Sequence, residues 1–264
     1  MTIALFTSCT STRKIYKQEV AQRFQEPTKA SRLITRDDLN KLPITVANYL
    51  ENCGWLGKEI PKNVHLEFSG KFSLKPGKYM NIKSEQYNWF DRPTRIFHMT
   101  NLLVSGRHRM DERGAFMLIK LLSRIKVVDA HGPEMNQAEL VTYLNDMCII
   151  APGALIEAPI EWKTVDEHTV KATISEYGNT ISALLYFNEK YELVNFTSND
   201  RFATSDGKET EQIPWSTPMG DYIEMNGIKV PGYGEAVWNY PDRDFVYAKF
   251  DVKEVKWNLK QPVK

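Results

Sequence analysis

PWSTPMGDYIEMNGIKVPGYGEAVWNYPDRDFVYAKFDVKEVKW, residues 214–257, contains the clearest structural signal in this chain. Asn226-Gly227 near its centre predicts a two-residue β-hairpin, because a type I′ turn needs positive φ at both central positions and Asn-Gly adopts it at low cost. After Pro231, two aromatic-rich runs are separated by PDRD at residues 241–244. The segment therefore predicts an antiparallel meander.

In the last of these runs, the apolar residues switch from even-numbered to odd-numbered positions. The apolar residues at 246, 248, 250 and 252 share one face of a strand, whereas Val255 and Trp257 lie on the other parity. A β-bulge near Lys253-Glu254 restores the register and bends the strand.

The same alternation occurs along most of the chain. Residues 64–74 alternate apolar and polar side chains with a period of two, which is typical of a half-buried antiparallel strand. Shorter runs predict strands at 79–87, 95–104, 160–162, 170–175 and 181–187, and 115–128 is apolar chain of ambiguous type. We count about ten antiparallel strands.

Helical patterns are fewer. Residues 12–25 have helical composition, and residues 42–53 begin with Leu42-Pro43 and end before Gly54. A third helix is expected at 136–148, where Asn136 and Glu139 form a capping-box pattern. Its apolar face, which should pack on the sheet, consists of Leu140, Val141, Leu144, Met147 and Cys148. The fold class is therefore mainly β (α+β), with one inserted helix and N-terminal helices.

The chain has no linker that divides it into independent domains. We expect residues 1–35 to form an N-terminal tether with a loosely held helix, and residues 36–264 to form a single antiparallel β domain. Of the 264 residues, 42% are hydrophobic and 25% charged, as in ordinary globular proteins. Because 34 basic residues face 33 acidic ones, the chain lacks the net positive charge of a nucleic-acid binder.

The three cysteines form neither a Cys-x-x-Cys motif nor a disulfide framework. Cys53 and Cys148 occupy apolar positions of predicted helices and are expected to be buried. Met1 to Cys9, MTIALFTSC, resembles the end of a bacterial lipoprotein signal, which makes Cys9 a lipidation candidate. A full signal has about 15–30 residues, so this interpretation requires a start upstream of Met1. Otherwise Cys9 is an incidental thiol.

Catalytic and metal-binding motifs are weak. His65, on the polar face of its strand, is expected in solvent, and His98 could face the interior. The five histidines lack metal-ligand spacing, so neither a metal nor a cofactor is predicted. Residues 106–114 have mixed charges typical of a solvated hairpin tip. Asp129, His131 and Glu134 lie in a turn that precedes Glu139, the expected helix cap, so no catalytic residue is assigned.

Three segments together resemble an uncharacterised bacterial family classed as a domain of unknown function. The first two are LPxxVxxYL at 42–50 and DAHGPEMxxxELxxYL at 129–144. The third is PW at 214–215, followed by Tyr222, GIKVP at 227–231, Trp238 and FxY at 245–247. The resemblance spans roughly residues 40–258. At fold level such proteins look like LolA/LolB-type lipoprotein carriers, which implies a strongly curved antiparallel sheet or half-barrel around an apolar cavity closed by helices.

The resemblance favours a non-enzymatic protein of the cell envelope that binds an apolar or lipid-like ligand, with membrane contact only through an anchor at Cys9. No ligand-binding residue is assigned, because core packing gives the same periodicity. The candidates for the cavity wall are Val64, Leu66, Phe68, Phe72, Ile181, Leu185, Phe250 and Val252.

Two alternatives remain open. One is a hydrolase-type enzyme with a site near residues 106–139, which requires His131, Glu134 and Arg109 to converge. The other is a structural or interaction module with a long unpaired edge strand. A cytoplasmic location is expected if Cys9 carries no anchor.

Overall fold

The computed structural model describes residues 11–263 and has the mainly β class that the sequence predicts. The described helices are α1 (Thr12–Phe24), α2 (Arg36–Leu39), α3 (Ile44–Asn52), α4 (Pro133–Ile150) and the 3-10 helix η1 (Pro152–Ile156). The strands before α4 are β1 (Asn63–Ser73), β2 (Tyr79–Trp89), β3 (Thr94–Thr100), β4 (Val104–Asp111), β5 (Gly114–Leu121) and β6 (Ile125–His131). Those after it are β7 (Ile160–Thr164), β8 (Thr169–Glu176), β9 (Asn179–Phe187), β10 (Leu193–Ser198), β11 (Phe202–Ala203), β12 (Glu211–Gln212), β13 (Trp215–Ser216), β14 (Met219–Met225), β15 (Ile228–Tyr240) and β16 (Arg243–Trp257).

Fourteen strands form one antiparallel sheet. Its order is β6-β5-β4-β3-β2-β1-β16-β15-β13-β10-β9-β8-β7, with β14 paired to β15. Strands β1 to β6 are a continuous meander, and β16 joins it to the second half of the chain by pairing with β1. The strands at the two ends of this order, β6 and β7, have seven and five residues. Strand β14, which pairs with β15 alone, also has seven residues, so these edges among residues 11–263 are shorter than the long unpaired strand expected of an interaction module.

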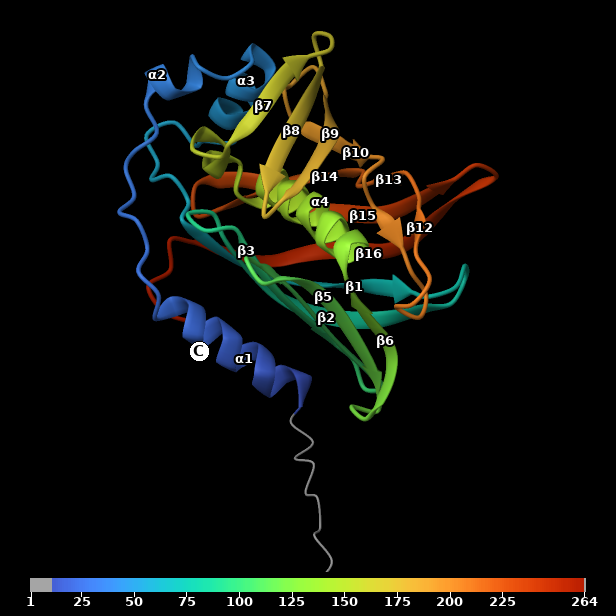
Figure 1. Cartoon of the computed structure of the whole chain (residues 1–264). Coiled ribbons are helices and arrows are strands. Elements are labelled where there is room, and N and C mark those ends of the chain that lie inside the picture. The colour runs from blue at the N-terminus through green and yellow to red at the C-terminus, as the bar shows by residue number, and fades with distance from the viewer. Residues whose placement is uncertain (1–10, 264) are drawn as a thin grey trace, which may run out of the picture.

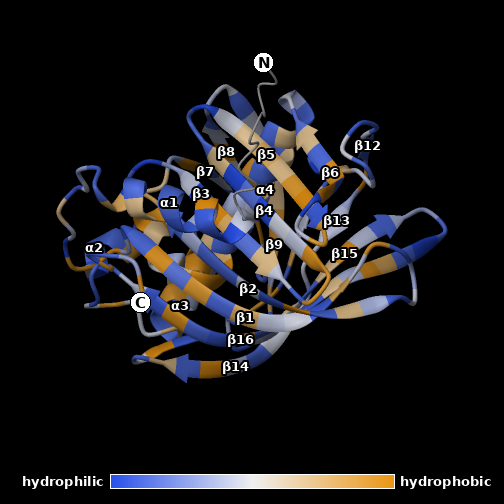
Figure 2. Cartoon of the chain, turned by 90° about the horizontal axis from the view of Figure 1, so that it is seen from below, coloured by the Kyte–Doolittle hydropathy of each residue, from blue (hydrophilic) through white to orange (hydrophobic). Residues whose placement is uncertain are grey.

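The sheet curls around α4, which Figure 1 shows enclosed between its two halves. Apolar and polar residues alternate along the strands (Figure 2), so each strand presents an inner face to α4 and an outer face to the other side. Leu140, Val141 and Leu144 of α4 are buried in the core, as the sequence predicts. Helix α4 therefore lies inside the half-barrel and packs against its inner face.

The start of α4 differs from the expectation. The helix begins at Pro133 after Gly132 as N-cap, because proline suits the first helical position, where its missing N–H forms no intrahelical bond. The prediction of a capping box formed by Asn136 and Glu139 is wrong. Asn136 Oδ1 instead accepts a hydrogen bond from the backbone N–H of Ala115 at 2.7 Å, and Glu139 lies in the protein interior.

Bulges bend the long C-terminal strand. The predicted bulge near Lys253 is confirmed, since Glu67 pairs with Glu254 and Phe68 pairs with Val252. A second bulge, which the sequence analysis did not predict, is at Tyr247, between the residues that pair with Ala236 and Val237. Because of this bulge, Tyr247 lies on the inner face and Val246 does not. The expectation that Val246 shares a face with Phe250 is therefore wrong.

Helix α1 covers the outer face of β3 and β4. Tyr16 and Val20 of α1 are buried against Tyr87 and Trp89, and Phe24 packs on the same cluster. The expectation of a loosely held helix is therefore wrong. The division at residue 35 stays a prediction.

Two histidines on the outer face are buried, contrary to the expectation for each. His65 is fully buried rather than solvated, because its ring packs on Tyr87 with the centroids 4.5 Å apart. His98 is buried on the outer face rather than the inner one, with its ring 5.4 Å from that of Tyr16. The inner face of β3 carries the residues of opposite parity, Phe97 and Met99.

The segment at 106–114 is not a solvated hairpin tip. Most of it belongs to β4 and β5, and Arg107 and Asp111 are buried. Arg107 pairs with Glu19 of α1 at 2.5 Å, so an outer-face helix neutralises charge that the sequence suggests is exposed. Cys53 and Cys148 are buried free thiols, as expected.

Candidate functional site

A cavity of about 530 Å³ lies between the inner face of the sheet and α4. Five of the eight residues proposed for its wall line it: Leu66, Phe68, Phe72, Phe250 and Val252. The other three, Val64, Ile181 and Leu185, belong to the packed core. The strands nearest the β1–β16 junction therefore form the apolar wall, whereas β9 packs solidly.

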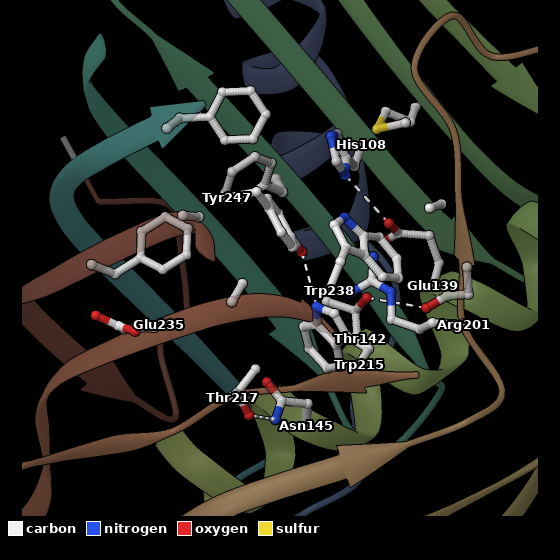
Figure 3. Close-up of a pocket in the computed structure, with 18 of the residues that line it drawn as sticks. His108, Glu139, Thr142, Asn145, Arg201, Trp215, Thr217, Glu235, Trp238 and Tyr247 are labelled. Carbon is white, nitrogen blue, oxygen red and sulfur yellow. Dashed lines mark hydrogen bonds and ion pairs between the residues drawn. The ribbon is translucent and has the colours of Figure 1, made fainter. Parts of the chain in front are cut away.

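The helix leaves space open along one stripe of short side chains, between longer lining residues such as Met135, Glu139 and Ile149. Ala138, Thr142 and Asn145 are spaced by four and three residues and line the cavity along one stripe of α4. Asn145 Nδ2 donates to Thr217 Oγ1 at 2.7 Å (Figure 3), which fixes the helix to the chain next to β13. Larger side chains on this stripe would fill part of the cavity.

Aromatic rings from three strands form the opposite side of the cavity (Figure 3). Trp238 of β15 stacks on Tyr247 of β16, with ring centroids 5.5 Å apart and planes at 21°. Trp215 of β13 donates its indole N–H to the Tyr247 hydroxyl at 3.1 Å. The guanidinium of Arg201 lies over both indoles, 4.3 Å from the Trp215 ring centroid and 5.4 Å from that of Trp238.

Charged groups lie at the base of the cavity. Arg95 of β3 donates to Glu139 of α4 at 3.0 Å, to Asp146 of α4 at 2.7 Å and to Gln86 of β2 at 3.0 Å. Burial tends to lower the pKa of Arg95, but Asp146 and Glu139 outweigh it, so the pKa is raised. Arg95 is therefore a permanent cation between two carboxylates.

His108 of β4 is the second partner of Glu139, with Nδ1 3.3 Å from Oε1. Burial alone would raise the pKa of Glu139, but Arg95 and the bond from His108 hold it at about 2. Burial lowers the pKa of His108 by more than Glu139 raises it. Because Glu139 is ionised and accepts, Nδ1 must carry the proton, and the buried Nε2 is an acceptor without a partner.

Such a charged cluster inside an apolar cavity is costly to the fold. Buried ion pairs gain little over apolar residues of the same size, because desolvation cancels most of the attraction. Arg95, His108 and Glu139 line the cavity. These residues are therefore suited to contacts with a bound molecule.

The hydrolase alternative depends on His131, Glu134 and Arg109. His131 and Arg109 both lie on the outer face, where each contacts the Phe116 ring, but they bind other partners: His131 binds Asp129 at 2.7 Å, and Arg109 pairs with Glu19 at 3.6 Å. Glu134 lies in the first turn of α4, and no hydrogen bond or ion pair joins these three side chains within the described residues. A cavity-facing role for Arg95 was missed, although its position carried a signal: it shares the parity of Phe97 and Met99.

One cluster among residues 11–263 has the spacing of a metal site. Single ligand atoms of His65, Glu67 and Glu85 lie within 4.8 Å of one another on the outer face. His65 Nε2 is 3.5 Å from Glu85 and 3.9 Å from Glu67, and its Nδ1 is 3.8 Å from Glu254. Both ring nitrogens of His65 are buried and have no hydrogen-bond partner among the described residues.

Cys9, the lipidation candidate, lies outside the described residues. Within the described part of the chain, no helix is long and apolar enough to cross a membrane.

Two solved structures are similar to this chain in fold. A LolA superfamily protein from Nitrosomonas europaea has a TM-score of 0.45 and 9% identity, over 82% of this chain and 94% of that one. A putative outer membrane lipoprotein-sorting protein domain from Vibrio parahaemolyticus has a TM-score of 0.45 and 8% identity, over 83% and 93%. A search of curated proteins finds no relative. Residues 32–250 match the profile of a family of unknown function, as the three motifs suggested, and the chain therefore belongs to that family, DUF6544.

Proposed function

We propose that this protein binds an apolar, lipid-like molecule in the cavity, without catalysis, at the cell envelope. The observation that carries the proposal is the open space of about 530 Å³ at a place where a protein core is normally filled. Ligand pockets commonly have about 300–1,000 Å³ and an apolar lining with a few polar groups. The cavity has that composition, with Phe68 and Phe250 on its wall and Arg95 at its base.

Aromatic pairs support the wall of the cavity. The Phe68 and Phe250 rings pack edge to face, with centroids 4.6 Å apart, and Phe250 is only partly buried. The Trp238–Tyr247 stack supports the other side. An apolar chain that enters this space removes aromatic surface from water, which favours binding by about 25 cal/mol for each Å² of apolar surface buried.

Native mass spectrometry of the gently purified protein tests the proposal. We expect a co-purified mass that organic extraction removes. Ala236→Phe places a ring in the cavity wall and should abolish that mass, whereas Ala21→Phe on the exposed side of α1 should keep it. A wild-type protein that is always free of ligand and binds no added alkyl chain would contradict the proposal.

We further propose that Cys9 carries a lipid anchor. Each buried CH₂ adds about 0.8 kcal/mol to membrane binding, so two or more acyl chains hold a protein stably. Cys9→Ser should release the protein from the membrane fraction without unfolding it. Unmodified Met1 on a protein from the soluble cytoplasmic fraction of native cells would refute the anchor and the envelope location together.

A further inference from the structure

Arg201 is a buried cation without a directly bonded counter-ion, and the Glu139 carboxylate interacts with it only at longer range. Its residue is 9% exposed, and its side chain forms no hydrogen bond or ion pair with any described residue. The Trp215 and Trp238 rings attract the face of the guanidinium, but this leaves the N–H donors in its plane unused. Buried charges in proteins are normally paired. The donors of Arg201 are therefore available to a bound molecule.

The other cation of the cavity is already neutralised. Arg95 and Arg201 are the two basic side chains, histidine apart, among the described residues that line the cavity. Arg95 contacts both Glu139 and Asp146, whereas Arg201 lies within 4.0 Å of no carboxylate. The backbone holds Arg201 in place, since its carbonyl accepts the N–H of Ile213 at 3.2 Å.

We propose that the ligand has a singly charged oxyanion head group, a carboxylate or a phosphodiester, and that Arg201 binds it. This inference rests on the proposed function, because the apolar tail lies in the space beside Phe68 and Phe250. A guanidinium donates two parallel hydrogen bonds to such an oxyanion. The unpartnered Nε2 of His108 accepts a hydroxyl hydrogen when the head group carries one.

Nearby acids limit the charge that the head group can carry. Glu139 faces the same base of the cavity, and Glu209, Glu211 and Glu235 line the cavity further along the chain. Of these, Glu235 is neutralised by Lys249 at 2.9 Å. A second negative charge on the ligand would meet unpaired carboxylates, so one charge is favoured over two.

Calorimetric titration of the full chain tests the head group at constant tail length. The probes with a ten-carbon chain are decanoate, decanol, decyl phosphate with two charges, and decanoyl lysophosphatidylglycerol as a phosphodiester; acetate is the probe without a tail. We expect decanoate and the phosphodiester to bind at least about tenfold more tightly than decanol and decyl phosphate, as charge-assisted hydrogen bonds predict. Acetate alone should not bind measurably.

Arg201→Gln should remove the preference for decanoate and leave decanol binding unchanged, which also shows that the variant is folded. Arg201→Lys should keep part of the preference, and Arg124→Gln in the exposed β5–β6 turn should keep all of it. Equal binding of decanoate and decanol, a preference that survives Arg201→Gln, or acetate binding as tight as decanoate overturns this inference alone. Binding of no alkyl probe overturns the proposed function and this inference with it.

Discussion

The two faces of one sheet meet different helices, and the difference separates a packed region from an open one. On the outer face, α1 presents large side chains such as Tyr16 and Phe24, which fill the space over β2 to β4. On the inner face, α4 presents Ala138, Thr142 and Asn145 and leaves about 530 Å³ unfilled. The short side chains along this one stripe of α4 therefore contribute to the open space, which the strand pattern alone does not explain.

Each face also buries a histidine, in a different electrostatic setting. His98, on the outer face, has its Nε2 3.3 Å from Thr12 Oγ1, under the aromatic ring of Tyr16. His108, on the inner face, bonds an ionised carboxylate and keeps one nitrogen free. The outer histidine is a packed core residue, whereas the inner one has unused bonding capacity.

Breaking the inner charge network should have the largest effect on stability. Arg95→Ala leaves the buried Glu139 and the partly buried Asp146 without their cation, and removal of one partner from a buried pair costs about 3–5 kcal/mol. Urea unfolding measures the loss. Arg36→Ala, which breaks an exposed pair with Glu51, is the matched control and should cost far less, because solvent screens exposed pairs. Equal losses would mean that the inner network is solvated.

Leu144→Ala tests whether α4 is a true core helix. Leu144 is fully buried on the side of α4 that packs on the sheet, so its truncation should cost roughly 2–5 kcal/mol. Thermal and urea unfolding give the value. A loss below about 0.5 kcal/mol would show that the helix is peripheral and that the comparison of the two faces is wrong.

Acidification should weaken the packing of His98 on the outer face. Burial and the neighbouring Arg13 and Arg107 lower the pKa of His98 from 6.5 to about 4, against an opposing effect of Glu85. The unfolded state therefore binds the proton more tightly, and stability present above pH 6.5 is lost as the pH falls towards 4. The shift corresponds to at most about 3 kcal/mol.

Unfolding free energies of wild type and His98→Gln at pH 7, 5.5 and 4.5 isolate this contribution. The difference between the two proteins should shrink as the pH falls. The pKa of Glu139 is lowered from 4.5 to about 2, so the stability that the ionised Glu139 contributes to the fold is lost only below about pH 4.5. Parallel curves for wild type and His98→Gln would show that His98 is solvated.

The smallest effect is expected for the cavity wall. Phe250→Ala should cost only about 1 kcal/mol, because Phe250 is partly exposed and its loss enlarges a space that already exists. Tyr16→Ala on the outer face creates a new void and should cost about 3 kcal/mol. Urea unfolding compares the two, and the reverse order would show that the cavity wall is the better packed face.

Local patterns predicted most of the fold. The Asn226-Gly227 hairpin forms with both φ angles positive, at 54° and 76°, and the 64–74 alternation becomes β1. These features depend on neighbours in sequence. The bulge at Tyr247 was missed because it is set by pairing with β15 rather than by the periodicity of β16 alone.

The site was harder to predict, because its residues meet only after the sheet has curled. Glu139 was interpreted as a cap, since its partners Arg95 and His108 are 44 and 31 residues away. His65 was expected in solvent because nothing in its strand shows that α1 packs near it. Arg201 lies in no motif, and its burial against Trp215 follows from tertiary contacts alone.

The pairing of β1 with β16 has a consequence for synthesis of the chain. Val64 lies opposite Trp257, so the first strand of the sheet waits for nearly the last residues before its second edge is bonded. Non-local contacts of this kind fold slowly. During translation the β1–β6 meander emerges as a partial sheet with an open edge, and such edges invite pairing with other chains. The nascent protein is therefore most exposed to aggregation just before β16 leaves the ribosome.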